Sequence, residues 1–408
     1  MKLPRASVPI ALASAVSLGA QVLFSLLMLR LFAPQAVGEF SVISQIAFFW
    51  MTLALAQSPL KLLADVHQSP VQALRLALGG SMLRLLLLLP LVWLGVLFSG
   101  LAETGQVLVW AALLAALQLG WYLAQPFTLR LASARSTALG RAVPPLLALV
   151  VAGALATLWP HTGSTGLLLA AASGYAVGAL WLLPARHASD AGSLAPIATP
   201  IAPTQADNRS AALRLIHTAA DALTGTAILL VWQRSHGAAE AGYLAVLLRV
   251  LGFVPTLIHA AWAQVLLAQG ARRNGSPLWV GLAGAMATGA LGLACVFAVR
   301  QQWFSAAWAG LLPILLPIML WQAAACLLAA CSHLPFQQGR ASTFSYAAIA
   351  FDAMQLVVLS APLALGYPLA AAAHAWWVGG ASVAGLMALS LLLLRPWLAA
   401  QVTPTKLG

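Results

Sequence analysis

Charged residues are scarce in this 408-residue chain: Asp, Glu, Lys and Arg make up only 7% of it, whereas hydrophobic residues make up 62%. No soluble core could bury so large an apolar fraction. Long apolar stretches recur along the chain, and they match the roughly 20 residues that an α-helix needs to cross the hydrocarbon core of a bilayer. The composition therefore excludes a soluble globular protein and predicts an all-α integral membrane protein.

Acidic residues and cysteines are also few, eight and three respectively. Cys295, Cys326 and Cys331 lie inside apolar stretches and lack the paired spacing of metal or redox sites. The sequence shows no paired carboxylates, no Ser-His-Asp set and no cluster of metal ligands. We therefore predict no catalytic residue, no metal and no cofactor, and we interpret the protein as a non-enzyme.

The basic residues indicate how the chain crosses the membrane. About twelve apolar stretches are long enough to span it, the third of them at residues 85–99. Of the 20 Lys and Arg, sixteen lie in alternate gaps or at the ends, three (Arg30, Arg234 and Arg300) lie in the other gaps, and Arg249 lies inside a stretch. Because basic loops stay cytoplasmic, this bias predicts that both termini are cytoplasmic. Topology and anionic headgroups thus account for the net charge of +12, without nucleic-acid binding.

One long connection divides the spans into six plus six. It is rich in Ala, Pro and Ser and predicts a flexible linker. We expect an N-terminal lobe at residues 1–184, a cytoplasmic linker at 185–214 and a C-terminal lobe at 215–408. Six residues of the first half recur 204 positions later: Gly38, Val42, Phe49, Thr52, Leu53 and Ala56. Both segments open the second span of their half, which favours parallel repeats around a central cavity, as in alternating-access carriers.

Two segments carry a resemblance to a known family. Residues 27–45, LMLRLFAPQAVGEFSVISQ, contain an arginine, a short loop with proline and a Gly-acid-aromatic start of the second span. The second half repeats the theme, with Asp221 in its first span followed by GAAEAGYLAVLLRVLGF. In this placement the chain resembles the Wzx-type O-antigen flippases of the multidrug/oligosaccharidyl-lipid/polysaccharide (MOP) superfamily. The resemblance covers essentially the whole chain.

This resemblance implies a multi-pass transporter of the bacterial inner membrane that takes part in O-antigen, lipopolysaccharide or exopolysaccharide synthesis. Its substrate would be a polyprenyl-diphosphate-linked oligosaccharide, flipped by alternating access. Membrane lipids surround it, and polysaccharide polymerase and assembly proteins are candidate partners. A drug or small-cation exporter and a lipid II flippase of the same fold remain alternatives. A membrane glycosyltransferase or polymerase is disfavoured, because such enzymes need acidic groups on a sizeable outside loop. The outside gaps here are short, and their acids are Glu39, Glu103 and Glu240.

Arg249 is the strongest candidate for a substrate-binding residue. It lies about two turns inside the eighth span, where a charge is costly unless it is paired or hydrated. On a helix it shares one face with Gly252, Thr256 and His259. A guanidinium can bind phosphate oxygens with two hydrogen bonds, which suits a diphosphate. In the alternative interpretation, Arg249 only ties two helices together through a buried carboxylate.

Further polar residues are expected to face the same cavity. Gln45 and Thr52 in the second span stand 204 positions before Arg249 and Thr256. Gln21 lies within a stripe of serines in the first span, which could mark either tight packing or the cavity. These three complete the predicted substrate-binding set.

Two carboxylates are candidates for ion coupling. Asp352 is the only acid near the middle of a span, and a desolvated carboxylate can exchange a proton near neutral pH. Asp221 lies nearer the cytoplasmic end of the seventh span, one turn after His217. For Asp352 a purely structural role as a partner of Arg249 stays open, and for Asp221 a position near a helix N-terminus is a sufficient explanation.

Overall fold

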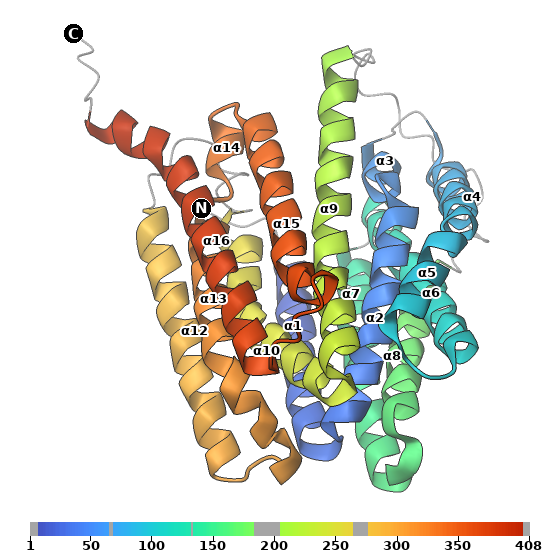
Figure 1. Cartoon of the computed structure of the whole chain (residues 1–408). Helices are drawn as coiled ribbons and strands as arrows, with labels where there is room; N and C mark the ends of the chain where they lie inside the picture. The colour runs from blue at the N-terminus through green and yellow to red at the C-terminus, as the bar shows by residue number, and fades with distance from the viewer. Residues whose placement is uncertain (1–6, 65–67, 132–133, 183–204, 264–275, 403–408) are drawn as a thin grey trace. The chain divides into compact units, whose positions relative to one another are not determined.

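The computed structural model describes residues 7–64, 68–131, 134–182, 205–263 and 276–402. Every regular element in these ranges is a helix (Figure 1). Eleven of them are long and apolar enough to cross a membrane, and one bent pair of helices supplies a twelfth span. The expected all-α membrane architecture with about twelve spans is confirmed.

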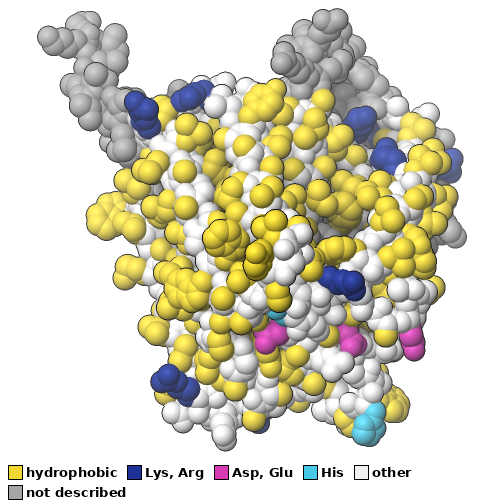
Figure 2. Space-filling model, in the orientation of Figure 1, with side chains coloured by type: hydrophobic (Ala, Val, Ile, Leu, Met, Phe, Trp, Pro, Cys, Tyr) yellow, Lys and Arg dark blue, Asp and Glu magenta, His cyan; other side chains and the backbone are white. Residues whose placement is uncertain are grey.

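The surface has the composition that a lipid environment requires. On the face shown in Figure 2, hydrophobic side chains cover most of the described surface and charged side chains are sparse. Large apolar residues such as Trp279, Met286 and Leu293 are more than two-thirds exposed along one helix. Exposure of this kind would be unfavourable in water but is favourable against acyl chains.

The chain forms two compact units. The first comprises Met1–Asp207 together with Gly237–Gly242, and the second comprises Asn208–His236 together with Tyr243–Gly408.

The helices of the first unit are α1 (Ser7–Leu31), α2 (Pro34–Leu55), α3 (Ser58–Ala64), α4 (Pro70–Leu87), α5 (Leu89–Ser99), α6 (Thr104–Arg130), α7 (Ala134–Leu158), the 3-10 turn η1 (Pro160–Thr162) and α8 (Gly163–Leu180). Within this unit, α1 packs along α7, and α8 packs against both α6 and α7. The more buried α2 contacts α4, α6 and α8. Apolar faces of α2 and α6 supply most of the core, including Trp50, Leu114 and Phe127.

The third span differs from its prediction. It begins at Pro70 instead of residue 85, and its two helices, α4 and α5, meet at an angle of 49°. Ser69 caps α4 by accepting a hydrogen bond from the Gln72 N–H at 3.3 Å. Pro90 has no N–H to continue the hydrogen-bond ladder, which explains the bend. The prediction started too late because the arginines of α4 were interpreted as loop residues.

Arg84 shows why an arginine is tolerated in this helix. Its guanidinium donates hydrogen bonds to the Ala54 carbonyl oxygen at 2.6 Å and the Leu55 carbonyl oxygen at 3.4 Å, both at the C-terminal end of α2. It also donates to the hydroxyl oxygens of Ser58 at 2.7 Å and Ser81 at 3.1 Å. The last carbonyls of a helix lack partners within the helix and carry partial negative charge. Arg84 therefore satisfies the end of α2 and joins it to α4.

Two other arginines of the first unit act in a similar way. Arg130, the last residue of α6, donates to the carbonyl oxygens of Leu62 and Gln68. Arg141 in α7 donates to the Ser14 hydroxyl oxygen in α1 at 3.1 Å. These cations bridge separate segments of the first unit in addition to any role in topology.

A second close contact within the first unit involves two glycines. Residues Gly237–Gly242 include the first turn of α10 (Ala238–Ile258), and this turn crosses the first turn of α2. A Cβ atom on Gly38 would overlap the Ala238 carbonyl oxygen and lie 2.9 Å from the Gly242 nitrogen. A Cβ atom on Gly242 would overlap the Pro34 carbonyl oxygen. The backbones approach this closely only because both positions lack a side chain.

The helices of the second unit are α9 (Gln205–His236), α10 from Tyr243 onward, the π-helical turn η3 (His259–Ala263), α12 (Pro277–Arg300), the 3-10 helix η5 (Ala306–Leu311), α13 (Leu312–Cys331), α14 (Leu334–Gln337), α15 (Ala341–Ala364) and α16 (Ala371–Val402). Here α13 packs along α12 and α16, and α15 packs against α16.

Residues 185–204 of the predicted linker lie outside the described residues, and its last ten residues belong to α9. In α10, Pro255 removes one backbone donor, and the helix passes four residues later into the π-helical turn η3.

Replacing Arg84 by Met should lower the stability of the protein by roughly 3 kcal/mol, because the carbonyl oxygens of α2 would lose a charged donor. Arg84→Lys should recover part of this loss. Thermal unfolding in detergent measures the effect. Arg75→Met, at an exposed position of the same helix, is the matched control and should change little. Equal melting temperatures for all variants would contradict the capping role.

Gly38→Ala should cost about 1–3 kcal/mol, because the added methyl group meets a backbone oxygen that cannot rotate away. Gly242→Ala should behave alike. The control is Gly19→Ala in α1, where a Cβ has nothing within 4 Å and helix propensity favours alanine by up to about 1 kcal/mol. Unfolding in detergent would disprove the contact if Gly38→Ala and Gly19→Ala shifted the melting temperature alike.

Candidate transport site

The polar stripe of α10 is built around Arg249. This residue lies midway along α10, roughly 16 Å from the start of the helix, and is half-buried. Gly252 and Thr256 follow it at the expected spacing. The Thr256 hydroxyl donates to the Gly252 carbonyl oxygen at 2.8 Å, so its proton is used within the helix while its oxygen stays exposed. The stripe therefore offers one cation and one acceptor oxygen.

His259 differs from the rest of the stripe because it lies in the π-helical turn η3. Its Nδ1 atom is 3.1 Å from the Ser332 hydroxyl oxygen. Ser332 already donates its proton to the Ala329 carbonyl oxygen at 2.8 Å. Nδ1 must therefore carry the hydrogen and donate to Ser332. His259 links the end of α10 to the end of α13 through this bond, and its other ring nitrogen remains available to a ligand.

Gln322 of α13 faces the same stripe. Its Oε1 atom lies 3.4 Å from the point where a Cβ of Gly252 would be. The Gln322 side chain is buried. A glycine one turn after Arg249 thus lets an amide from α13 approach the polar face of α10.

The two predicted coupling carboxylates lie near each other in the second unit. Asp352 in α15 is only 6% exposed, and its Oδ2 atom has no hydrogen-bond partner among the described residues. Asp221 in α9 is close enough to interact electrostatically with Asp352, and it also interacts with His217 one turn before it. Two carboxylates in an apolar setting repel each other unless a proton or a cation is shared between them. Burial of both carboxylates therefore disfavours their simultaneous ionisation.

A polar seam between α15 and α16 continues from Asp352. Gln355, three residues after Asp352, donates from its Nε2 atom to the Ser382 hydroxyl oxygen of α16 at 2.7 Å. Both side chains are buried. Thr224, one turn after Asp221, has a buried hydroxyl without a partner among the described residues. The second unit therefore brings together several polar groups that apolar surroundings would not otherwise retain.

The predicted residues of the first unit lie on α1 and α2. Gln21 is exposed, and its amide nitrogen is 3.5 Å from the Ser17 hydroxyl oxygen. Gln45 and Thr52 are half-buried on α2, two turns apart. These three residues belong to the first unit, whereas Asp221 and Asp352 belong to the second. The substrate role of these three residues remains a prediction.

Sequence reasoning missed Ser382, Thr224 and the partnership of Gln322 with Gly252. A serine or threonine in an apolar helix is common in packed helix pairs and signals no site by itself. Their spacing to Arg249 or Asp352 along the chain is too irregular to reveal a contact. Only the packing of α9, α10, α13, α15 and α16 brings them together.

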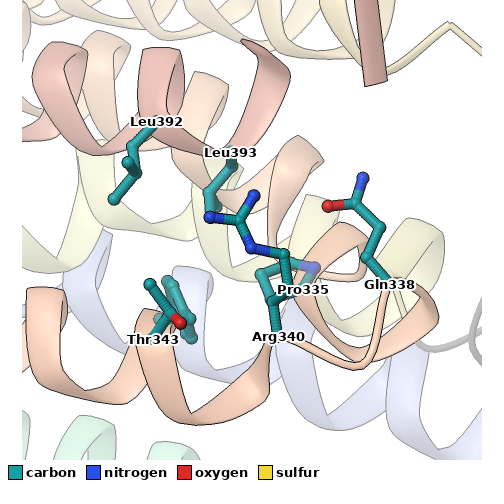
Figure 3. A pocket seen from close by; sticks show the side chains of 7 residues that line it. Pro335, Gln338, Arg340, Thr343, Leu392 and Leu393 are labelled. Atoms are coloured by element: carbon teal, nitrogen blue, oxygen red, sulfur yellow. The ribbon is translucent and has the colours of Figure 1, made fainter. Parts of the chain in front are cut away.

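A small pocket opens beside the start of α15 in the second unit (Figure 3). Its lining residues are Pro335, Gln338, Arg340, Thr343, Phe344, Leu392 and Leu393. The Arg340 side chain extends from the start of α15 toward Leu393 of α16. A cation whose stem lies along apolar residues at the end of a span is typical of a side chain that reaches lipid headgroups. None of the predicted substrate-binding residues lines this pocket.

The arrangement of helices defines the class of protein: a multi-pass membrane protein with the fold of MOP-superfamily transporters. The structure of the lipid II flippase MurJ in an inward closed conformation matches 96% of this chain and 87% of its own, with a TM-score of 0.65 and 12% identity. An inward-facing multidrug resistance MATE family transporter of the MOP superfamily matches 98% of this chain and 100% of its own, with a TM-score of 0.60 and 12% identity.

A MOP superfamily transporter from Pyrococcus furiosus matches 98% of this chain and 96% of its own, with a TM-score of 0.51 and 14% identity. No protein-family model and no curated protein matches the sequence. At these identities the likeness establishes the fold. The proteins with these similar structures are transporters.

Proposed function

We propose that this protein flips a polyprenyl-diphosphate-linked oligosaccharide, such as an O-antigen or exopolysaccharide repeat unit, across the bacterial inner membrane by alternating access. The likeness to a flippase over 96% of the chain, combined with an arginine midway along α10, carries this proposal. A lipid-linked diphosphate is anionic and must pass the apolar centre of the bilayer. An arginine at that depth can bind it at the point where solvation by water is lost.

The two lobes at residues 1–184 and 215–408, joined by the linker at 185–214, would alternate in opening to either side, with both termini in the cytoplasm. In this mechanism Arg249 contributes the cation of the cavity, and Thr256 and His259 add polar groups on the same side. The polar residues of the first lobe, Gln21, Gln45 and Thr52, would bind the sugar hydroxyls. Neutral amides and hydroxyls suit a glycan, because they both donate and accept hydrogen bonds.

Asp352 and Asp221 would couple transport to a cation. The repulsion between two nearby carboxylates is relieved when one cation binds, and the relief is lost when it leaves. A carrier can therefore favour one conformation with the cation bound and another without it. The polar seam from Asp352 to Ser382 supports an exchange that involves α15 and α16, whose relative position such a cycle would change.

A drug or small-cation exporter is the second candidate, because a multidrug MATE transporter has the same fold over the full length of both chains. Acidic residues alone would suffice to bind a cationic drug, whereas Arg249 would repel it. The cation on α10 therefore favours an anionic substrate over a cationic drug. A lipid II flippase would differ from the proposed function only in the glycan that the lipid carries.

Arg249→Ala should reduce surface polysaccharide by about tenfold to a hundredfold, because one or two charged hydrogen bonds to the diphosphate would be lost. Arg249→Lys should retain part of the activity, since it keeps the charge but not the paired donors. The assay complements a deletion strain and measures surface polysaccharide and accumulated lipid-linked precursor. Arg234→Ala, at an exposed position near the end of α9, is the control. Normal export by stably inserted Arg249→Ala would refute the phosphate role.

Asp352→Asn should abolish gradient-driven transport by reconstituted protein while polyprenyl diphosphate still binds, because an amide keeps the size of the side chain but cannot exchange a cation. Glu103→Gln, the same change at an exposed carboxylate, should have no effect. If Asp352 instead only neutralises Arg249, the variant should lose roughly 3–5 kcal/mol of stability. A stable variant with unchanged gradient dependence would rule out coupling through Asp352.

A further inference from the structure

Two histidines far apart in the sequence form a buried pair in the second unit. His236 is the last residue of α9, and His374 lies in the first turn of α16. The His236 Nε2 and His374 Nδ1 atoms are 2.9 Å apart. The other ring nitrogen of His374, Nε2, is 3.0 Å from the Leu359 carbonyl oxygen of α15. His374 is 1% exposed, whereas His236 is half-buried and reaches the surface.

These contacts determine where the hydrogens lie. A carbonyl oxygen can only accept, so His374 must donate from Nε2 to Leu359. In a neutral ring the other nitrogen, Nδ1, then has a lone pair and accepts. His236 must therefore donate from Nε2 to His374, which leaves the His236 Nδ1 atom with a lone pair. The neutral pair is a directed chain of two hydrogen bonds that begins at His236 and ends on the backbone of α15.

One added proton fits this chain without moving any heavy atom. It would bind to Nδ1 of His236, and the bond from His236 to His374 would become charge-assisted and stronger. The hydrogen in that bond can also shift to His374 Nδ1, which moves the charge from one ring to the other. A second proton would place two N–H groups against each other at 2.9 Å. The geometry therefore accepts one proton and excludes two.

The Trp232 ring packs against both histidine rings. Its ring is stacked on that of His374 with centroids 4.9 Å apart, and it meets the edge of His236 at 4.8 Å. An indole face attracts a cation, so Trp232 stabilises the protonated pair in surroundings that offer little water. Trp232 itself is buried at 1% exposure.

Within the second unit, no carboxylate of the described parts of α9, α15 and α16 is hydrogen-bonded to the pair, and Glu240, four residues after His236, belongs to the first unit. Besides these histidines, the titratable or charged residues of the described parts of α9, α15 and α16 are Asp207, Arg209, Arg214, His217, Asp221, Arg234, Tyr346, Asp352 and Arg395. Of the charged groups in the second unit, His374 interacts electrostatically with His236, and this interaction opposes a charge on both rings at once. Within the second unit, a proton on the pair would therefore be held by the two rings and by Trp232.

We propose that His236 and His374 form a binding site for a single proton, and that this proton is the ion that drives the carrier. The assignment of the proton as the driving ion rests on the function proposed above, whereas the proton site itself does not. Leu359, Gln355 and Asp352 share one buried face of α15, so the pair lies roughly 10 Å along that helix from the carboxylate. Protonation of the histidine pair at one end of this face and loss of a cation from Asp352 at the other end would act on the same helix pair, α15 and α16.

Nitrogen NMR of histidine-labelled protein in lipid nanodiscs tests the site without any substrate. We expect both rings to carry hydrogen on Nε2 at neutral pH, with a scalar coupling between His236 Nε2 and His374 Nδ1. On acidification the two rings should titrate together and take up one proton. His374→Gln should abolish the coupling and leave His236 to titrate alone. His161→Gln in η1 of the first unit is the control and should leave the coupling unchanged.

Two independent titrations, or the absence of the coupling in the folded protein, would overturn the proton site. If His374→Gln does not fold, His236→Gln at the half-buried end of the pair provides the same test. For the driving ion, proteoliposomes that contain polyprenyl diphosphate are given either a proton or a sodium gradient. Loss of proton-driven transport in both His374→Gln and His236→Gln supports the proposal. Sodium-driven transport that survives in these variants refutes it. Failure of the transport proposal itself would instead appear as normal export by Arg249→Ala.

Discussion

The absence of water in the hydrocarbon core is the constraint on which the rest of this structure depends. Each buried polar group must find a partner within the protein, or its burial costs several kcal/mol. The Arg84 guanidinium shows the first outcome, because it saturates the carbonyl end of α2 and two hydroxyl groups at once. Asp352 shows the second, since one of its oxygens is buried without a partner among the described residues. The contrast separates a side chain that joins two helices from one with an unsatisfied oxygen.

The same constraint explains the close approach of backbones where side chains are absent. Lipid tails are as apolar as leucine, so helices in a membrane associate through tight packing instead of through exclusion of water. Gly38 and Gly242 stand 204 residues apart and meet the carbonyl oxygens of Ala238 and Pro34, which are also 204 residues apart. The repeat in the sequence thus corresponds to a reciprocal contact in space, and glycine is required on both sides of it.

Histidines and carboxylates occupy different places within the second unit. The carboxylates lie within the spans, on α9 and α15, and they interact electrostatically. The histidines lie at the end of α9 and the beginning of α16, joined by hydrogen bonds and covered by Trp232. Imidazole is suited to such a place because it can donate and accept along one line without a net charge. A carboxylate at the same point would need a counter-ion that the described surroundings do not offer.

The sequence by itself determined the all-α membrane class, the number of spans and the depth of Arg249 and Asp352, because hydrophobic length and the cost of a buried charge depend only on composition along the chain. It failed at the third span, where Arg75 and Arg84 were read as loop residues although carbonyl groups of another helix stabilise Arg84. Only the tertiary structure decided which polar groups meet. The Gln355–Ser382, His259–Ser332 and His236–His374 contacts join residues from different helices, and no periodicity within one helix specifies its neighbour.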